Sequence, residues 1–259
     1  MQLISKVPVV AEGPALRLAG VAKAFGPKLA VSGMDLELRR GELYALLGPN
    51  GAGKTTTLRM IAGLLKPDRG AISIFGIDAL RDPIAARRIT AWLPDEPMLY
   101  DKLTPAEYLE FIAGLWGVDR HLAARRAAEL IEVLDLGPHA HVRCEGFSRG
   151  MKQKVALAGA LIHDPHLIML DEPLTGIDAA IARQVKELLN ERVRSGATIV
   201  LTTHILEVAE RMADRIGIVA GGKLVAEGTF TELKAAAGRD HTTLEDVFLS
   251  LTMRSSEAA

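Results

Sequence analysis

The stretch GPNGAGKT (residues 48–55) decides the fold of this chain. It satisfies the pattern G-x-x-x-x-G-K-[ST], follows the apolar run LYALL (43–47) and opens the helix-like run GKTTTLRMIAGLL (53–65). Strand, glycine loop and helix in this order are the context that a phosphate-binding loop requires. A glycine-rich turn with a chance lysine would not explain why a strand directly precedes the motif and a helix directly follows it. The stretch therefore predicts a nucleotide-binding α/β domain.

Each part of this loop suits the phosphates of a nucleotide. Gly48, Gly51 and Gly53 let the backbone approach closely and point N–H groups at phosphate oxygens. The following helix adds the positive end of its dipole. Lys54 can reach the β- and γ-phosphates, and the Thr55 hydroxyl can bind Mg²⁺. The predicted nucleotide-binding residues of the loop are Gly48, Pro49, Asn50, Gly51, Ala52, Gly53, Lys54, Thr55 and Thr56.

Two observations bear on the base of the nucleotide. The chain has no N-K-x-D motif of the kind that reads guanine, so ATP is favoured over GTP. Phe25, in KAFG (23–26), offers a flat face on which a base could stack. A lone phenylalanine is more often a core residue, so Phe25 alone decides little.

Two further runs place polar side chains at strand ends. LIMLDEP (167–173) predicts a buried strand that delivers Asp171 and Glu172 at its carboxyl end, where α/β sheets bind ligands. Asp171 can hold Mg²⁺, and Glu172 can orient or deprotonate a water molecule. IVLTTH (199–204) ends a second strand at His204, which could contact the γ-phosphate and the attacking water. Positioning and charge neutralisation suffice for phosphoryl transfer to water, so no covalent intermediate is needed.

The periodicity along the chain predicts one α/β domain with an insertion. Strand and helix patterns alternate before about residue 83 and after about 165, which favours a mostly parallel sheet covered by helices. Between them the pattern is mostly helical, with Thr104, Pro105 and Glu107 forming a capping box at one helix start. We expect an extension at 1–13, the domain at 14–230 with a helical subdomain at about 83–165, and a helical tail at 231–259.

Composition excludes several classes of protein. The 31 basic and 32 acidic residues nearly cancel, so nothing predicts non-specific binding of nucleic acid. Cys144 is the only cysteine, which rules out an intrachain disulfide and fits a reducing compartment. No apolar run suits a signal peptide or a membrane span. We therefore expect a protein that reaches a membrane only through a partner.

The stretch FSRGMKQK (147–154) begins another helix, with Ser148 as a capping residue. Together with the phosphate loop, LDEP, LTGID (174–178) and His204, it resembles the ATP-binding subunits of ABC transporters over residues from about 15 to 230. The resemblance implies a P-loop NTPase fold with a RecA-like, mostly parallel core sheet, an N-terminal antiparallel β part and an inserted α-helical subdomain. It also implies an ATPase that dimerises around two ATP molecules.

The resemblance assigns roles to individual residues. Ser148 and Gly150 would cap the ATP held by a second copy, and Asp178 would link the two sites. The other implied roles are adenine stacking for Phe25, Mg²⁺ binding for Asp171, general base for Glu172 and γ-phosphate contact for His204.

The chain departs from the family's pattern at two positions. Arg149 stands in the signature loop where the family usually has glycine, and Asp95, in LPDEP (93–97), stands where it usually has glutamine. A carboxylate at position 95 could still bind Mg²⁺, but it donates no hydrogen bond unless protonated. The departure at position 95 therefore changes how this loop could contact a γ-phosphate.

The predicted partners are a second ATPase subunit, identical or homologous, and an integral membrane transporter subunit at the cytoplasmic face. Five of the eleven aromatic residues lie between 92 and 116, either as a small subdomain core or, for Tyr100 and its neighbours, as a groove for the membrane subunit. TTLEDVFLSLT (242–252) resembles the end of exporter-type subunits, so export is favoured over import. The alternatives are a soluble ABC-type ATPase acting on ribosomes or DNA and a regulatory module that binds ATP without turnover.

Overall fold

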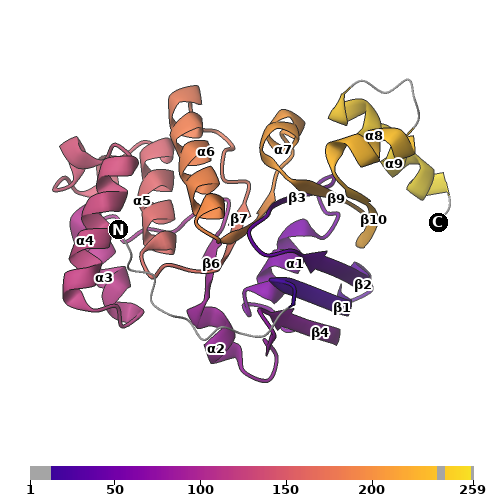
Figure 1. Cartoon of the computed structure of the whole chain (residues 1–259), viewed down its shortest axis with the longest axis horizontal. Helices are drawn as coiled ribbons and strands as arrows, with labels where there is room; N and C mark the ends of the chain where they lie inside the picture. Colours follow the sequence, from indigo (N-terminus) through magenta and orange to yellow (C-terminus); the bar gives the residue numbers. More distant parts are fainter. Residues whose placement is uncertain (1–12, 238–242, 258–259) are drawn as a thin grey trace.

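A computed structural model describes residues 13–237 and 243–257, with the side chains of 251–257 left out. Its N-terminal part is a four-stranded antiparallel sheet, and Figure 1 shows three of its strands side by side. In spatial order the strands are β2 (Lys28–Leu38), β1 (Leu16–Phe25), β4 (Arg69–Ile74) and β5 (Ile77–Asp78). The predicted extension at 1–13 lies outside the described residues except for residue 13.

The second sheet has six strands and carries the candidate site. In spatial order they are β10 (Lys223–Gly228), β9 (Arg215–Ala220), β3 (Leu43–Leu47), β8 (Thr198–Thr202), β7 (Leu167–Asp171) and β6 (Thr90–Leu93). All neighbours are parallel except the β9–β10 hairpin. The carboxyl ends of β3, β7 and β8 therefore meet at one edge, with Leu46 opposite Thr202 and Thr202 opposite Asp171. The predicted mostly parallel core sheet and antiparallel N-terminal part are confirmed.

Helices cover the parallel sheet, and α1 lies between the two sheets in Figure 1. The long helices α3, α4 and α5 stand together at one end of the molecule, away from α8 and α9. The helices are α1 (Lys54–Ile61), α2 (Pro83–Arg88), α3 (Pro105–Leu115), α4 (Arg120–Val133), α5 (Arg149–Leu161), α6 (Ala179–Arg194), α7 (Leu206–Met212), α8 (Phe230–Ala237) and α9 (Leu244–Glu257), with 3₁₀ turns at Gly137–His139 and Cys144–Gly146.

The helix starts follow from local side-chain chemistry. Thr104 accepts from the backbone N–H of Glu107 and Glu107 reaches back to the N–H of Thr104, which confirms the capping box at α3. Ser148 caps α5 and Asp178 caps α6 in the same way, each accepting from the backbone N–H three residues on. These caps fix where the helices begin, and hence where the loops before them lie.

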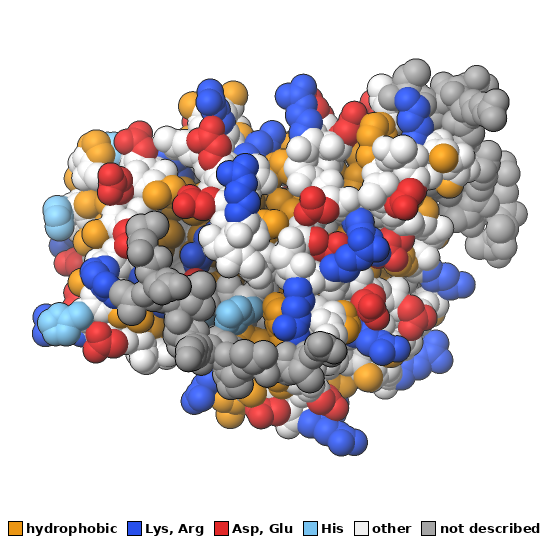
Figure 2. Space-filling view, in the orientation of Figure 1, with side chains coloured by type: hydrophobic (Ala, Val, Ile, Leu, Met, Phe, Trp, Pro, Cys, Tyr) orange, Lys and Arg blue, Asp and Glu red, His pale blue; other side chains and the backbone are white. Residues whose placement is uncertain are grey.

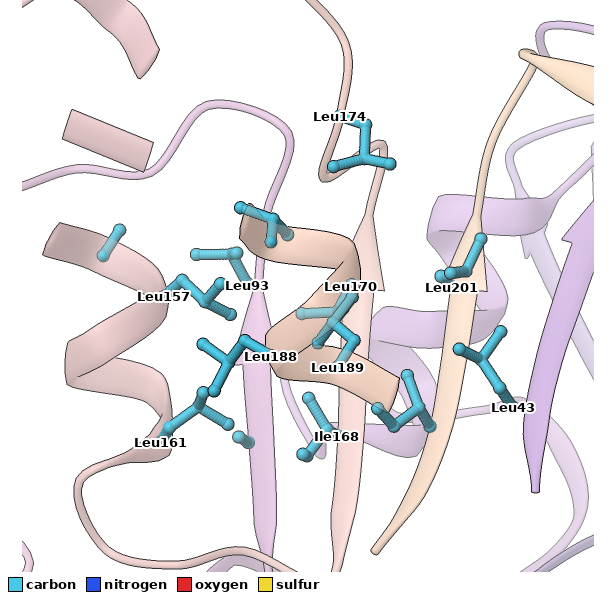
Figure 3. Close-up of a cluster of buried hydrophobic side chains, with 14 of the residues drawn as sticks. Leu43, Leu93, Leu157, Leu161, Ile168, Leu170, Leu174, Leu188, Leu189 and Leu201 are labelled. Carbon is cyan, nitrogen blue, oxygen red and sulfur yellow. The ribbon is translucent and has the colours of Figure 1, made fainter. Parts of the chain in front are cut away.

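The core explains the continuous apolar runs of the sequence. Strands β3, β7 and β8 are buried along their whole length because helices cover both faces of the sheet. Figure 3 shows Ile168 and Leu170 of β7 packed with side chains of α5 and α6, including Leu157 and Leu188. Full burial of such a side chain stabilises the fold by roughly 1.5–3 kcal/mol. The strands are therefore a rigid base for the polar residues that follow them.

Strand β6 was not predicted. It falls within the range expected for the helical insertion, about 83–165, yet it pairs with β7 as an edge of the core sheet. Its four residues TAWL are too short to carry a strand pattern, and it is the pairing with β7 that makes them a strand. The helices α3, α4 and α5 begin only after this strand and the loop that contains Asp95.

The surface carries charges of both signs, as the near-equal numbers of basic and acidic residues predict. Figure 2 shows acidic and basic side chains interspersed over the face in view. Cys144 is buried in the core, and burial raises the pKa of its thiol. Within the part of the chain that the structure describes, no helix has both the length and the apolar character needed to cross a bilayer.

Candidate active site

The phosphate loop connects β3 to α1 and is pressed against two other strands. A Cβ at Gly48 would lie 2.4 Å from the carbonyl oxygen of Val219 in β9. A Cβ at Gly53, where φ is +107°, would lie 2.4 Å from the carbonyl oxygen of Ala30 in β2. Both positions therefore require glycine, and the loop is held in a fixed shape between β2 and β9.

Lys54 lies at the bottom of this loop, almost fully buried. Its Nζ donates to the carbonyl oxygens of Gly48 at 2.6 Å and Pro49 at 3.2 Å. Burial lowers the pKa of Lys54, and the negative charges of Glu172 and Asp171 oppose that shift. The lysine predicted to contact phosphate thus shares one site with the two predicted acids.

Asp171 ends β7 and is buried beneath the loop. Thr202, opposite it on β8, donates its hydroxyl proton to Asp171 Oδ1. The same hydroxyl oxygen accepts from the backbone N–H of Glu172 at 3.1 Å. Thr202 therefore holds both acids in place, and its role was not predicted.

Glu172 follows the strand in a left-handed conformation, with φ of +50°. Such a conformation costs a non-glycine residue of order 1 kcal/mol and persists where the surroundings impose it, often at functional sites. Its Oε2 accepts from the Thr175 hydroxyl at 3.0 Å and from the backbone N–H of His204 at 3.3 Å. The Nδ1 of His204 lies 2.8 Å from the same oxygen. The carboxylate is thus fixed at the strand ends beside the imidazole.

A cavity of about 430 Å³ opens over these residues. Its walls come from the phosphate loop, LPDEP, LDEP, LTGID and LTTH, so it joins five of the separately predicted motifs. The lining residues are Gly48, Pro49, Asn50, Asp95, Glu172, Thr175, Thr203, His204, Leu206 and Phe248. The volume and the mixture of polar and apolar walls suit a small-molecule ligand.

Three predicted binding residues stand at helix starts and do not line this cavity. Ser148 and Asp178 are helix caps, and neither they nor Gly150 line its wall. Gly150 packs α5 against the start of α6, where an added Cβ would lie 2.6 Å from Ile181 Cδ1. The chain therefore carries two separate groups of predicted nucleotide-binding residues.

Phe25 lies at the tip of the β1–β2 hairpin and is half-exposed rather than in the core. Lys23 Nζ lies 5.8 Å from the centre of its ring. Lys28, at the other side of the same hairpin, reaches to within 3.9 Å of a Cβ built on Gly51. The exposed ring is therefore on a hairpin that approaches the phosphate loop, although Phe25 does not line the cavity.

Sequence reasoning missed four residues of this site. Thr175, Thr202 and Thr203 position or surround the acids, and Phe248 brings the C-terminal helix α9 to the cavity wall. The threonines stand within LTGID and LTTH, beside residues that were predicted, so polar neighbours of a catalytic acid were the available signal. No local pattern indicates that α9 folds back to this cavity.

A comparison with protein families matches residues 31–175 to the family described as ABC transporter. The linearmycin resistance ATP-binding protein LnrL of Bacillus subtilis (strain 168) is 38% identical over 225 residues, which are 87% of this chain and 72% of that protein. The match to the ABC transporter family agrees with the transport prediction rather than with the ribosome or DNA alternative.

Solved structures agree with the fold. A structure titled as the ATP binding subunit of an ABC transporter superposes with a TM-score of 0.86 at 35% identity, over 92% of this chain and 99% of that chain. A dimeric ATP-binding cassette in a post-hydrolysis state, bound to ADP and Pi, superposes with a TM-score of 0.75 at 27% identity, over 83% of this chain and 98% of that chain.

Proposed function

This chain belongs to the ABC transporter family, as an ATP-binding and ATP-hydrolysing subunit, and from that premise we propose which residues perform the chemistry. The observation that carries the proposal is one cavity lined by Glu172, His204 and the phosphate loop. Lys54 donates to carbonyl oxygens of that same loop. We propose that this cavity binds the phosphates of ATP and that Glu172 activates the water that attacks the γ-phosphate.

The bond changes are those of a direct hydrolysis. A water oxygen forms a bond to the γ-phosphorus, its proton passes to the Glu172 carboxylate, and the bond to the β-phosphate oxygen breaks to release ADP and phosphate. The loop N–H groups and Lys54 stabilise the charge on the phosphate oxygens. His204 and Thr175 keep the Glu172 carboxylate in one orientation, so the base is positioned before the nucleotide arrives.

The oxygen-bearing side chains predicted to bind a metal suit Mg²⁺. This ion prefers oxygen ligands and is commonly held by one or two carboxylates together with substrate phosphates. We propose Thr55 and Asp171 as its protein ligands; Asp95, the third residue predicted from the sequence, is instead paired with Arg149. Among the described residues no group of three or more His, Cys, Asp or Glu side chains forms a metal site, so the ion would depend on the nucleotide. When bound, it would neutralise charge on the phosphates.

A second copy, or a homologous ATPase subunit, is the proposed occupant of the second group of residues. Ser148, Gly150 and Asp178 stand at the starts of α5 and α6, where backbone N–H groups suit an anion. None of them lines the chain's own cavity, which supports their acting on ATP held by the other subunit. Phe25 would stack on the adenine of the chain's own ATP.

The membrane partner is proposed to dock on aromatic residues near the start of the helical subdomain. Tyr100 and Phe111 form an edge-to-face pair with ring centroids 5.1 Å apart, and both are exposed. Met98 beside them is 90% exposed. Tyr108 does not belong to this surface, because it is buried in the core. Trp116 is exposed but stacks on His163 rather than on the Tyr100–Phe111 pair. An exposed aromatic pair suits an apolar anchor of a partner helix.

We also propose export as the direction of transport and the cytoplasmic face of the membrane as the location. The name of LnrL refers to antibiotic resistance, which supports export as the direction for this chain. Docking on a membrane subunit would place the chain at the cytoplasmic face of the membrane. The transported molecule is not determined by any residue of the ATPase site.

Binding and turnover by a Lys54→Ala variant test the assignment of the cavity. We expect the variant to bind ATP more weakly and to hydrolyse it slowly, because a buried cation beside the phosphates is lost. A Lys186→Ala variant in α6 serves as the control. Unchanged affinity and rate in Lys54→Ala would show that the phosphate loop has been misread.

Purification from native membranes in mild detergent tests the partner. Co-purification of a polytopic membrane protein at comparable abundance is expected, whereas ribosomal proteins in its place would overturn the transport assignment. In the reconstituted pair, Tyr100→Ala should reduce stimulation of the ATPase by the membrane subunit. A Leu64→Ala variant, which removes an exposed leucine elsewhere, should not.

A further inference from the structure

Arg149 is the first residue of α5, immediately after the capping Ser148. Its side chain does not extend away from the protein. One terminal nitrogen donates to Asp95 Oδ1 at 3.1 Å, across 54 positions of sequence. The two positions where the sequence departs from the family's pattern are therefore in direct contact with each other.

The guanidinium of Arg149 also packs on a third loop. A Cβ built on Gly176 would lie 3.2–3.4 Å from three atoms of that group, and φ at Gly176 is +71°. The absence of a side chain at Gly176 thus leaves room for the flat face of the guanidinium. Arg149 consequently joins the loop of Asp95, the loop of Ser148 and the loop of Thr175 and Asp178.

Asp95 lines the wall of the nucleotide cavity. The other two carboxylates of the site, Glu172 and Asp171, act electrostatically on Lys54, whereas Asp95 is not among the charges that act on it. Within the described residues, the ion pair of Asp95 is with Arg149. The negative charges of Glu172 and Asp171 are therefore offset by Lys54. The negative charge of Asp95 is offset by Arg149.

We propose that Arg149 is the counter-ion of Asp95 and acts as a positioning residue for ATP, keeping the cavity wall electrically neutral where a polyphosphate must enter. The inference rests on the proposed function, because it requires that ATP binds in this cavity. The pair also connects this wall to the start of α5, where Ser148 is proposed to contact the second nucleotide.

The effect belongs to the site rather than to folding. Both side chains are about half exposed, and exposed ion pairs contribute little to folding stability. An uncompensated carboxylate on the wall would repel the phosphates through a partly solvated cavity. Removal of Arg149 should therefore raise the KM for ATP by about three- to tenfold, with a smaller effect on kcat.

The test is a double-mutant cycle on the full chain, with ATPase kinetics at saturating Mg²⁺. Arg149→Gln should raise the KM for ATP, and Asp95→Asn in the same chain should restore it to within about twofold of wild type, because no charge is then left uncompensated. Arg149→Lys keeps the charge and should recover most of the affinity. The defect of Arg149→Gln should shrink at about 0.5 M salt, since salt screens an exposed charge.

Two results would overturn the inference while leaving the proposed function intact. The first is an unchanged KM in Arg149→Gln. The second is failure of Asp95→Asn to rescue it, which would show that Asp95 acts directly on the nucleotide or its metal. Arg183→Gln, which breaks an exposed ion pair with Glu187 on α6, is the matched control and should leave KM unchanged. A wild-type chain that neither binds nor hydrolyses ATP would instead refute the proposed function itself.

Discussion

Replacement of Glu172 by glutamine separates the two properties of this side chain, its shape and its charge. Glutamine has the same length, and its carbonyl oxygen can still accept from the Thr175 hydroxyl and the His204 backbone N–H. The orientation of the side chain should therefore survive, together with the left-handed backbone at this position. What is lost is the ability to accept a proton from water.

The expected fall in kcat follows from the loss of this proton acceptor alone. A positioned general base contributes typically 10²–10⁴-fold to a rate, so kcat should fall by about that factor, equivalent to roughly 3–5 kcal/mol in the barrier. Affinity for ATP should remain within about threefold of wild type, because the variant removes a negative charge near the phosphates and leaves Lys54 in place. An ATP-bound dimer should then accumulate.

The assay combines three measurements on the purified protein. Phosphate release gives kcat, titration with a fluorescent ATP analogue gives affinity, and size-exclusion chromatography with ATP gives the oligomeric state. Glu207→Gln, in which the exposed partner of Arg211 on α7 is neutralised, controls for loss of a carboxylate elsewhere. Turnover by Glu172→Gln within tenfold of wild type would remove Glu172 from the role of base, and a parallel loss of affinity would assign it to binding.

Three further substitutions test the packing and electrostatics around the site. Gly159→Ala should lower Tm by about 2–4 °C for each kcal/mol lost, because the new Cβ would lie 2.6 Å from the buried Tyr108 ring. Gly114→Ala, which has open space around it, should instead raise Tm slightly. Equal Tm shifts for the two variants would refute the contact with Tyr108. Thr202→Val should lower the free energy of unfolding by about 1–3 kcal/mol in a denaturant titration, because Asp171 and the Glu172 N–H lose their shared hydrogen-bond partner. An unchanged free energy of unfolding would mean that water replaces the hydroxyl. Burial lowers the pKa of His163 despite its contact with the Thr90 carbonyl, so the folded state favours the neutral ring. The contribution of this neutral ring to the free energy of unfolding should be fully present above about pH 6.5, and it should be lost as the pH drops toward the folded pKa. His163→Phe, which keeps a ring against Trp116, should lose less stability than wild type between pH 7 and 5 in the same titration, and an exposed-site control, His121→Gln, should behave as wild type.

The parts of the fold that could be predicted are those whose cause is local. The run LYALL, the glycines of residues 48–53 and the cap at Thr104 each act on their own neighbours, so strand, loop and helix start were readable. Strand β6 could not be predicted from the sequence, because only its pairing with β7 makes it a strand. The approach of α9 to the cavity has the same cause, since it depends on packing between distant segments.

The site shows the same division. Lys54, Asp171, Glu172 and His204 were predicted from their places at a loop and at strand ends. The structure places Glu172 and His204 on one cavity, with Lys54 bonded to the phosphate loop and Asp171 bonded to Thr202 at the neighbouring strand end. The hydroxyls that hold the acids lay next to them in sequence but had no pattern of their own. The contact between Arg149 and Asp95 was not readable, because each residue stood out separately as a departure and only the fold brings them together.

The burial of Cys144 makes this chain a convenient subject for thiol labelling. A thiolate, not a thiol, reacts with maleimides and spin labels, and a buried thiol with a raised pKa forms little thiolate near neutral pH. One cysteine introduced at an exposed position, such as Glu187 on α6, would therefore carry the only reactive label in each subunit. Distances between two such labels could then follow the approach and separation of a pair of subunits through one cycle of ATP hydrolysis, without removal of the native cysteine.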